Sequence, residues 1–170
     1  VDIEGFISSI PGSAFSITAE GEMRDWAVRV ATDLGGIPFF VSDEDKPLYH
    51  TAASMASNYL VTLMNIVEGI YRQMGMGEKE ALRSFWPLVQ GTMRNIEEKG
   101  TETSLTGPIA RGDIGTIRRH LTVIGEKAPR LLALYREMGL LAADIAVRNS
   151  TLSEDRAGEI QSLLKGDSHE

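Results

Sequence analysis

Polar side chains recur every fourth residue along an otherwise apolar segment, at His50, Ser54, Asn58 and Thr62. On a 3.6-residue helix this spacing keeps them on one slowly drifting stripe. A buried polar group without a partner costs about 1–3 kcal/mol, so a buried stripe needs hydrogen-bond partners from a ligand or from the protein. It could line a ligand site in which His50 is an acid or base and Asn58 donates and accepts hydrogen bonds. The commoner alternative is a stripe that faces solvent or meets another helix.

The segment 105–113, LTGPIARGD, is a second candidate site. Its two glycines and one proline fix a particular backbone path. Arg111 precedes a predicted helix start at Asp113, where its guanidinium could hold a carboxylate or phosphate. The helix N-terminus itself also favours anions. A helix cap beside a solvated arginine explains the segment equally well.

A basic cluster follows at residues 118–120, with Lys127 and Arg130 close behind. Within it, His120 lies seven residues after Asp113, so the two can share one helix face two turns apart. The cluster could recognise an anion, although such clusters are more often a solvated helix face.

Composition and charge exclude or disfavour several classes of protein and of functional site. The chain has 170 residues, 42% hydrophobic and 24% charged, which is typical of one globular domain. It has no Cys, which excludes disulfides, thiol catalysis and Cys-ligated zinc and suits a cytoplasmic protein. The net charge of −7 disfavours nucleic-acid binding.

We expect no membrane span, because no apolar run reaches the roughly 18 residues required. The first residue is Val1 rather than Met, so we expect a processed N-terminus or a piece of a longer protein.

The N-terminal 46 residues predict a strand, a helix and a strand. The segment 15–18 alternates apolar and polar residues, 22–34 has one apolar helical face, and 37–41 is a short apolar run. This order favours a parallel pair. Two strands are not stable alone, and nothing later in the chain predicts another strand.

From Pro47 onward the pattern is helical. We expect Pro87 to kink or split the second helix near Trp86. The fold class is therefore mainly α after a small βαβ segment. The predicted helices span 47–74, 78–99, 113–124, 127–149 and 153–164.

Several well-known motifs are missing. There is no GxGxxG dinucleotide motif, no phosphate-binding GxxxxGK[ST], no HExxH and no GxSxG. The three His residues have no metal-ligand spacing, so we predict no metal site.

Two segments carry a family resemblance: PLYHTAASMASNYLVTLMNIVEGIYRQMG from Pro47 and LTGPIARGDIGTIRRHL from Leu105. They resemble Rossmann-like proteins with a C-terminal helical domain of unknown function, in the 6-phosphogluconate dehydrogenase-like superfamily. The family pattern has Tyr-His at the start of the first long helix, Asn two turns later, and a Thr-Gly-Pro-x-x-Arg-Gly-Asp loop. The matching residues are Tyr49-His50, Asn58, 106–108 and 111–113.

The resemblance implies an NAD(P)-dependent oxidoreductase that acts on a small carbonyl or hydroxy-acid substrate. Residues 1–46 would end a Rossmann-like domain whose NAD- or NADP-binding glycine loop lies upstream of Val1. Residues 47–170 would form a helical domain that supplies the substrate side of the cleft and a homodimer interface. The apolar helices 47–74 and 127–149 also favour a dimer, since one small bundle cannot bury both.

One departure from related enzymes concerns the catalytic group. β-Hydroxyacid dehydrogenases and ketopantoate reductases have a Lys one turn before the Asn, where this chain has Ser54. Serine cannot act as the cationic acid that polarises a carbonyl. Either His50 takes the role of that lysine, or the chemistry differs, or the chain is a non-catalytic binding or dimerisation module. The resemblance makes His50 and Asn58 the catalytic candidates and assigns substrate binding to Ser54, Thr106, Arg111, Asp113 and His120.

Overall fold

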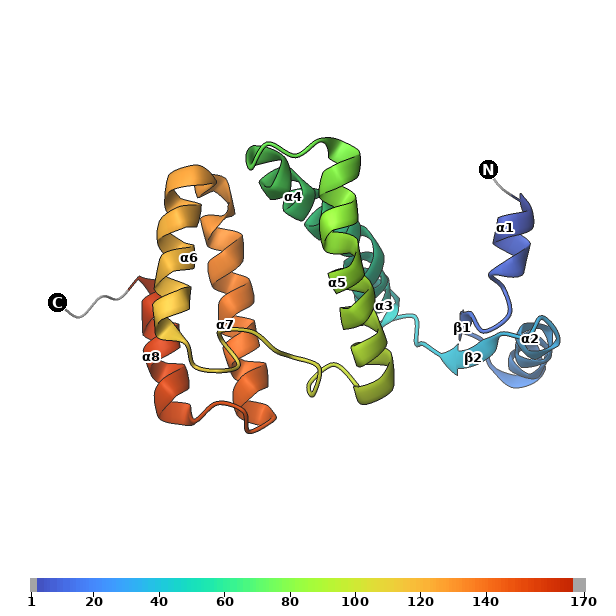
Figure 1. The fold of residues 1–170 in the computed structure, drawn as a ribbon. Coiled ribbons are helices and arrows are strands. Elements are labelled where there is room, and N and C mark those ends of the chain that lie inside the picture. Colours follow the sequence, from blue (N-terminus) through green and yellow to red (C-terminus); the bar gives the residue numbers. More distant parts are fainter. Residues whose placement is uncertain (1–2, 167–170) are drawn as a thin grey trace. The chain divides into compact units, whose positions relative to one another are not determined.

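The computed structural model describes residues 3–166 and is mainly helical, as predicted (Figure 1). The chain forms two compact units, residues 1–81 and 82–170, and the boundary falls within helix α5 (Glu78–Lys99). The predicted domain limits, 1–46 and 47–170, stay a prediction, because a compact unit reflects packing and not the domain arrangement of longer relatives.

The first unit opens with α1 (Ile3–Ser8), which the sequence did not predict, and then forms the predicted βαβ segment. Strand β1 (Ala14–Ile17) pairs in parallel with β2 (Ile37–Phe40) across helix α2 (Gly21–Asp33). The turn after α2 requires glycine, because a Cβ at residue 36 would lie 2.3 Å from the Phe15 ring. The expected parallel pair is therefore confirmed, and β1–β2 is a two-stranded sheet among the described residues.

The long helix that follows β2 is continuous but not uniform. It runs as α3 (Lys46–Ser54), a π turn (Met55–Tyr59) and α4 (Leu60–Gln73). The prediction of one helix over 47–74 is correct in extent. It missed the π turn, because i→i+5 bonding leaves no composition signal in the sequence.

The second unit contains most of α5 and then α6 (Ile114–Lys127), a 3₁₀ turn (Pro129–Leu131), α7 (Leu132–Arg148) and α8 (Glu154–Lys165). Pro87 does not split α5, so that alternative was wrong. Its missing N–H removes one bond from a helix of 22 residues, whose other turns hold the helix together.

The core of the second unit lies between α6, α7 and α8. Ile117, Ile160 and Leu164 are the largest completely buried side chains, and alanines of α7 let the helices approach closely. Along the described chain, no helix combines the length and hydrophobicity that a bilayer span requires.

Candidate functional site

The carboxyl edge of the sheet leads directly into the helix that carries the predicted catalytic residues. Parallel β1 and β2 end at the same edge, where the Thr18 hydroxyl donates to the Val41 carbonyl at 2.6 Å. Open α/β sheets bind ligands outside the carboxyl ends of their strands. The short loop 41–45 connects this edge to α3, and His50 lies within α3.

Local contacts fix the start of α3. The Asp45 N–H donates to the Ser42 hydroxyl at 3.0 Å, and that hydroxyl donates to the Asp45 carboxylate at 2.7 Å. The Tyr49 ring meets the Phe39 ring of β2 edge-on, with centroids 5.4 Å apart. The backbone at His50 is thus tied to the sheet while its side chain stays exposed.

The polar stripe lies on a helix without fully buried residues. His50 and Asn58 are exposed and Ser54 is half-buried, so no desolvation cost compels partners within the unit. Asn58 lies inside the π turn, and the Thr62 hydroxyl donates to its backbone carbonyl at 2.9 Å. Single π turns within α-helices frequently occur at functional sites. The imidazole of His50 and the amide of Asn58 are both available to a ligand.

An apolar cavity of about 300 Å³ lies between β1 and α2. Trp26 contributes to its wall although its side chain is 54% exposed. A βαβ unit covered on both faces would bury such a residue. The cavity is lined by residues of β1, of the turn that follows it and of the middle and C-terminal part of α2: Phe15, Ser16, Ile17, Thr18, Ala19, Trp26, Ala27, Val30 and Ala31.

The loop 105–113 owes its shape to α8. Gly112 has a φ of 67°, and a Cβ there would lie 3.0 Å from the Cγ of Arg156. The Arg156 Nε donates to the Gly112 carbonyl at 3.0 Å. The sequence predicted a glycine-dependent loop but missed Arg156, because no local spacing links a loop to a side chain 44 residues away.

Asp113 caps α6, as predicted. Its carboxylate accepts hydrogen bonds from the Thr116 backbone N–H at 3.0 Å and from the Thr116 hydroxyl at 2.7 Å. The hydroxyl bond and then the backbone bond from Thr116 lower the pKa of Asp113 most. Burial raises it in opposition, and the charges of Arg119 and Arg111 lower it further. The carboxylate is therefore ionised at neutral pH and committed to the helix start. A substrate contact of Asp113 stays a prediction.

His120 has a partner that the sequence did not reveal. Its Nδ1 lies 2.9 Å from the Tyr135 hydroxyl of α7, and the two rings meet edge-on at 82°. Burial raises the pKa of Tyr135, which keeps the phenol protonated and able to donate. This contact occupies Nδ1, so Nε2 of His120 is the atom left for a ligand.

The seven predicted site residues divide between the two units. His50, Ser54 and Asn58 belong to the first unit, and Thr106, Arg111, Asp113 and His120 belong to the second. Thr106 and Arg111 are exposed on their loop. A single cleft formed by both sets stays a prediction.

The strand-to-helix turn of the βαβ segment does not fit a dinucleotide. A pyrophosphate needs several glycines and free N–H groups at the helix start. Here the turn from β1 to α2 has one glycine, Gly21, between the carboxylates of Glu20 and Glu22. Those charges repel phosphate, so residues 18–22 cannot serve as the pyrophosphate site.

Residues 13–142 match the model of DUF2520, a domain of unknown function. This match covers well over half of the chain. The chain belongs to the DUF2520 family. No curated protein matches it.

Two solved structures resemble this DUF2520 chain. Protein TM1727 from Thermotoga maritima aligns with a TM-score of 0.78 and 27% identity, over 88% of this chain and 60% of that protein. The "putative NADP oxidoreductase BF3122" from Bacteroides fragilis aligns with a TM-score of 0.62 and 19% identity, over 77% of this chain and 49% of that protein. The chain thus spans 60% and 49% of the lengths of these two proteins, and the second likeness shows a shared fold only.

Proposed function

We propose that this DUF2520 chain is the C-terminal part of an NAD(P)-dependent oxidoreductase that acts on a small carbonyl or hydroxy-acid substrate. In this proposal the chain supplies the substrate side of the cleft and a dimer interface. The nicotinamide cofactor binds to another part of the longer protein, since residues 18–22 do not fit a pyrophosphate.

The observation that carries the proposal is the junction of β2 with α3. A parallel sheet ends beside the start of a helix that presents His50 and Asn58 to solvent. Trp26 of α2 and Leu34 at its C-cap are exposed, as expected where further sheet packs in a longer protein. The fold shared with BF3122 supports this reading.

Each candidate residue would have its own role in the reaction. His50 would donate a proton to the substrate oxygen or remove one from it, because serine at residue 54 cannot supply a cationic acid. Asn58 would orient the substrate by donating and accepting hydrogen bonds. Ser54, Thr106, Arg111, Asp113 and His120 would bind the rest of the substrate, with Arg111 suited to a carboxylate.

We also propose a homodimer. Leu134, Met138 and Leu141 recur at helical spacing along α7 and are 40%, 51% and 59% exposed. A second copy would remove this stripe from water. Light scattering should give a dimer that Leu141→Glu shifts toward monomer, and a monomer at every concentration would contradict the interface.

The test of the activity uses the full-length protein, both nicotinamide cofactors and a panel of small carbonyl and hydroxy acids. We expect turnover that His50→Gln lowers by about a hundredfold or more. Asn58→Ala should raise KM or lower kcat, while Asn65→Ala, also exposed on the same helix, should change neither. Equal effects of the two Asn variants would exclude Asn58 from the site.

The alternative is a non-catalytic module that binds a small molecule or only dimerises. Ser54 in place of the lysine of related enzymes favours it. Saturable ligand binding without turnover for every cofactor and substrate pair would select this alternative.

A further inference from the structure

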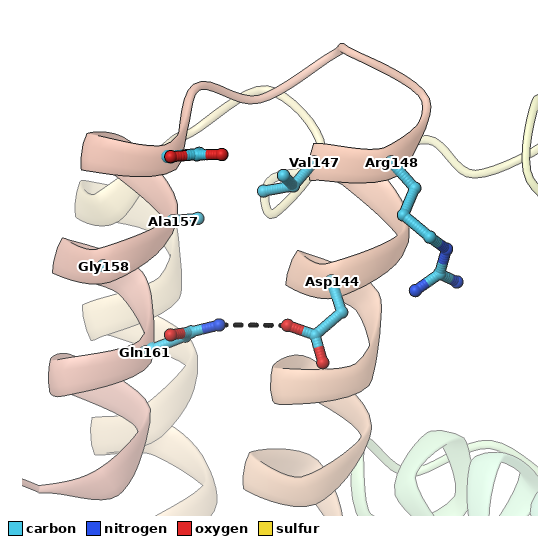
Figure 2. Close-up of a pocket in the computed structure, with 7 residues that line it drawn as sticks. Asp144, Val147, Arg148, Ala157, Gly158 and Gln161 are labelled. Atoms are coloured by element: carbon cyan, nitrogen blue, oxygen red, sulfur yellow. Dashed lines mark hydrogen bonds between the residues drawn. The ribbon is translucent and has the colours of Figure 1, made fainter.

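An open groove of about 390 Å³ runs between α7 and α8, and all of its lining residues follow the segment that matches the family (Figure 2). Its floor is apolar and shallow, formed by Val147, Ala157 and Gly158. A Cβ on Gly158 would meet nothing within 4 Å, so helix packing does not require glycine there. Glycine inside a helix costs about 0.5–1 kcal/mol relative to alanine, and its effect here is to keep the groove open.

The two ends of the groove carry carboxylates. Asp144 accepts a hydrogen bond from the Gln161 side chain at 3.0 Å, which places it beside Gln161 (Figure 2). Glu154 precedes Gln161 by seven residues, so it lies on the same face of α8, about 10 Å away along the axis. The apolar floor lies between these two levels.

No cation of the groove neutralises these carboxylates. Arg148 is four residues after Asp144, but its Nε pairs with Glu102 at 3.0 Å and its side chain points away from α8 (Figure 2). Among the described residues, none makes a hydrogen bond or ion pair with the carboxylate of Glu154. The groove therefore presents two negative charges on either side of an apolar strip, in a chain of net charge −7.

We propose that this groove binds a linear aliphatic diamine or polyamine. One ammonium would bind Asp144, the other would bind Glu154, and the methylene chain would lie over Val147, Ala157 and Gly158. Carboxylates about 10 Å apart cannot share one metal ion, whose ligands lie within about 2.6 Å. A monoamine would reach only one end. The proposal is independent of the proposed oxidoreductase function.

The experiment is calorimetric titration of the 170-residue chain with spermidine, cadaverine and butylamine at physiological ionic strength, where the Debye length is about 8 Å. We expect spermidine to bind about tenfold more tightly than butylamine, because the second ammonium adds a charge-assisted hydrogen bond. Glu154→Gln and Asp144→Asn should each weaken spermidine severalfold and leave butylamine much less changed.

Asp155→Asn is the matched control, because it removes the same charge from the first turn of α8 outside the groove. Gly158→Leu should fill the groove and abolish binding, with circular dichroism to confirm folding. Equal affinities for spermidine and butylamine would show that the second ammonium finds no partner in the groove. Equal effects of Glu154→Gln and Asp155→Asn would show nonspecific attraction to an acidic chain, and either result would overturn the proposal.

Discussion

The two units bury their apolar residues to very different degrees. In residues 82–170, Ile117, Ile160 and Leu164 are 0% exposed and form one closed core. In residues 1–81, Trp26 of α2 and the C-cap residue Leu34 are instead 54% and 46% exposed. The second unit thus has large side chains that are completely buried, although α7 also exposes the stripe of Leu134, Met138 and Leu141, whereas the described part of the first unit buries no large side chain completely.

This difference distinguishes apolar residues that already stabilise the folded chain from those that would add stability only when another surface covers them. An apolar side chain with 0% exposure stabilises the chain as it stands. A half-exposed one contributes its full burial energy only when something covers it, at roughly 25 cal/mol per Å² of apolar surface removed from water.

The largest effect should come from the closed core. Ile160→Ala removes a completely buried side chain and should lower the free energy of unfolding by about 2–5 kcal/mol. Leu34→Ala, the control at the C-cap of α2, should cost about 0.5 kcal/mol or less because the side chain is half-exposed. Urea denaturation measures the free energy of unfolding of both variants. Similar losses would contradict the stated difference in burial between the two units.

Two glycines of the second unit should respond in opposite directions. Gly112→Ala places a Cβ at a φ of 67° and 3.0 Å from Arg156, which should cost about 1–2 kcal/mol or more. Gly158→Ala meets open space within a helix and should stabilise by about 0.5–1 kcal/mol. Thermal unfolding of the two variants should show melting temperatures shifted to opposite sides of the parent chain. Equal shifts would mean that the loop 105–113 does not depend on α8.

A smaller and pH-dependent effect is expected at the cap of α6. The folded pKa of Asp113 lies below its ordinary value of 3.8, so the unfolded chain binds the proton more readily. Its stabilisation is fully present above the unfolded pKa and is lost as the pH falls through the folded one. Asp113→Asn should therefore be less stable than the parent at neutral pH and converge with it in acid. A constant difference in urea midpoint down to the acid limit would rule out this ionisation.

The smallest expected signal is the binding of NADPH to this chain. Glu20 and Glu22 flank the strand-to-helix turn, so a titration followed by Trp fluorescence should show no saturable, salt-resistant binding. Micromolar binding that survives added salt would mean that the first unit holds a cofactor site of its own.

Most elements of the fold could be predicted from the sequence. The Gly-Gly stop after α2, the Asp113 cap and the Ser153 cap of α8 all act within a few residues, so local patterns reveal them. The π turn could not be predicted, because it changes the bonding of a helix without changing its composition. The continuity of α5 through Pro87 depends on neighbouring turns that a single-residue rule ignores.

The candidate site was predictable only in part. The types and spacing of His50 and Asn58 pointed to the long helix, and the loop at Arg111 was apparent from its glycines. Tyr135 and Arg156 were missed because each lies 15 or more residues away from its partner in the sequence. Contacts of that kind are properties of the packed structure and leave no periodic signal along the chain.

The π turn at Met55–Tyr59 makes the orientation of α4 sensitive to the deletion of a single residue. It holds one residue more than an α turn, so it acts as a one-residue insertion that the helix absorbs without breaking. Deleting one residue there would restore α register and rotate Leu60–Gln73 by about 100° relative to Lys46–Ser54. Leu63, Ile66 and Val67, now half-buried, would turn with it. The direction in which α4 presents its apolar side chains is therefore set by a single residue of chain length upstream.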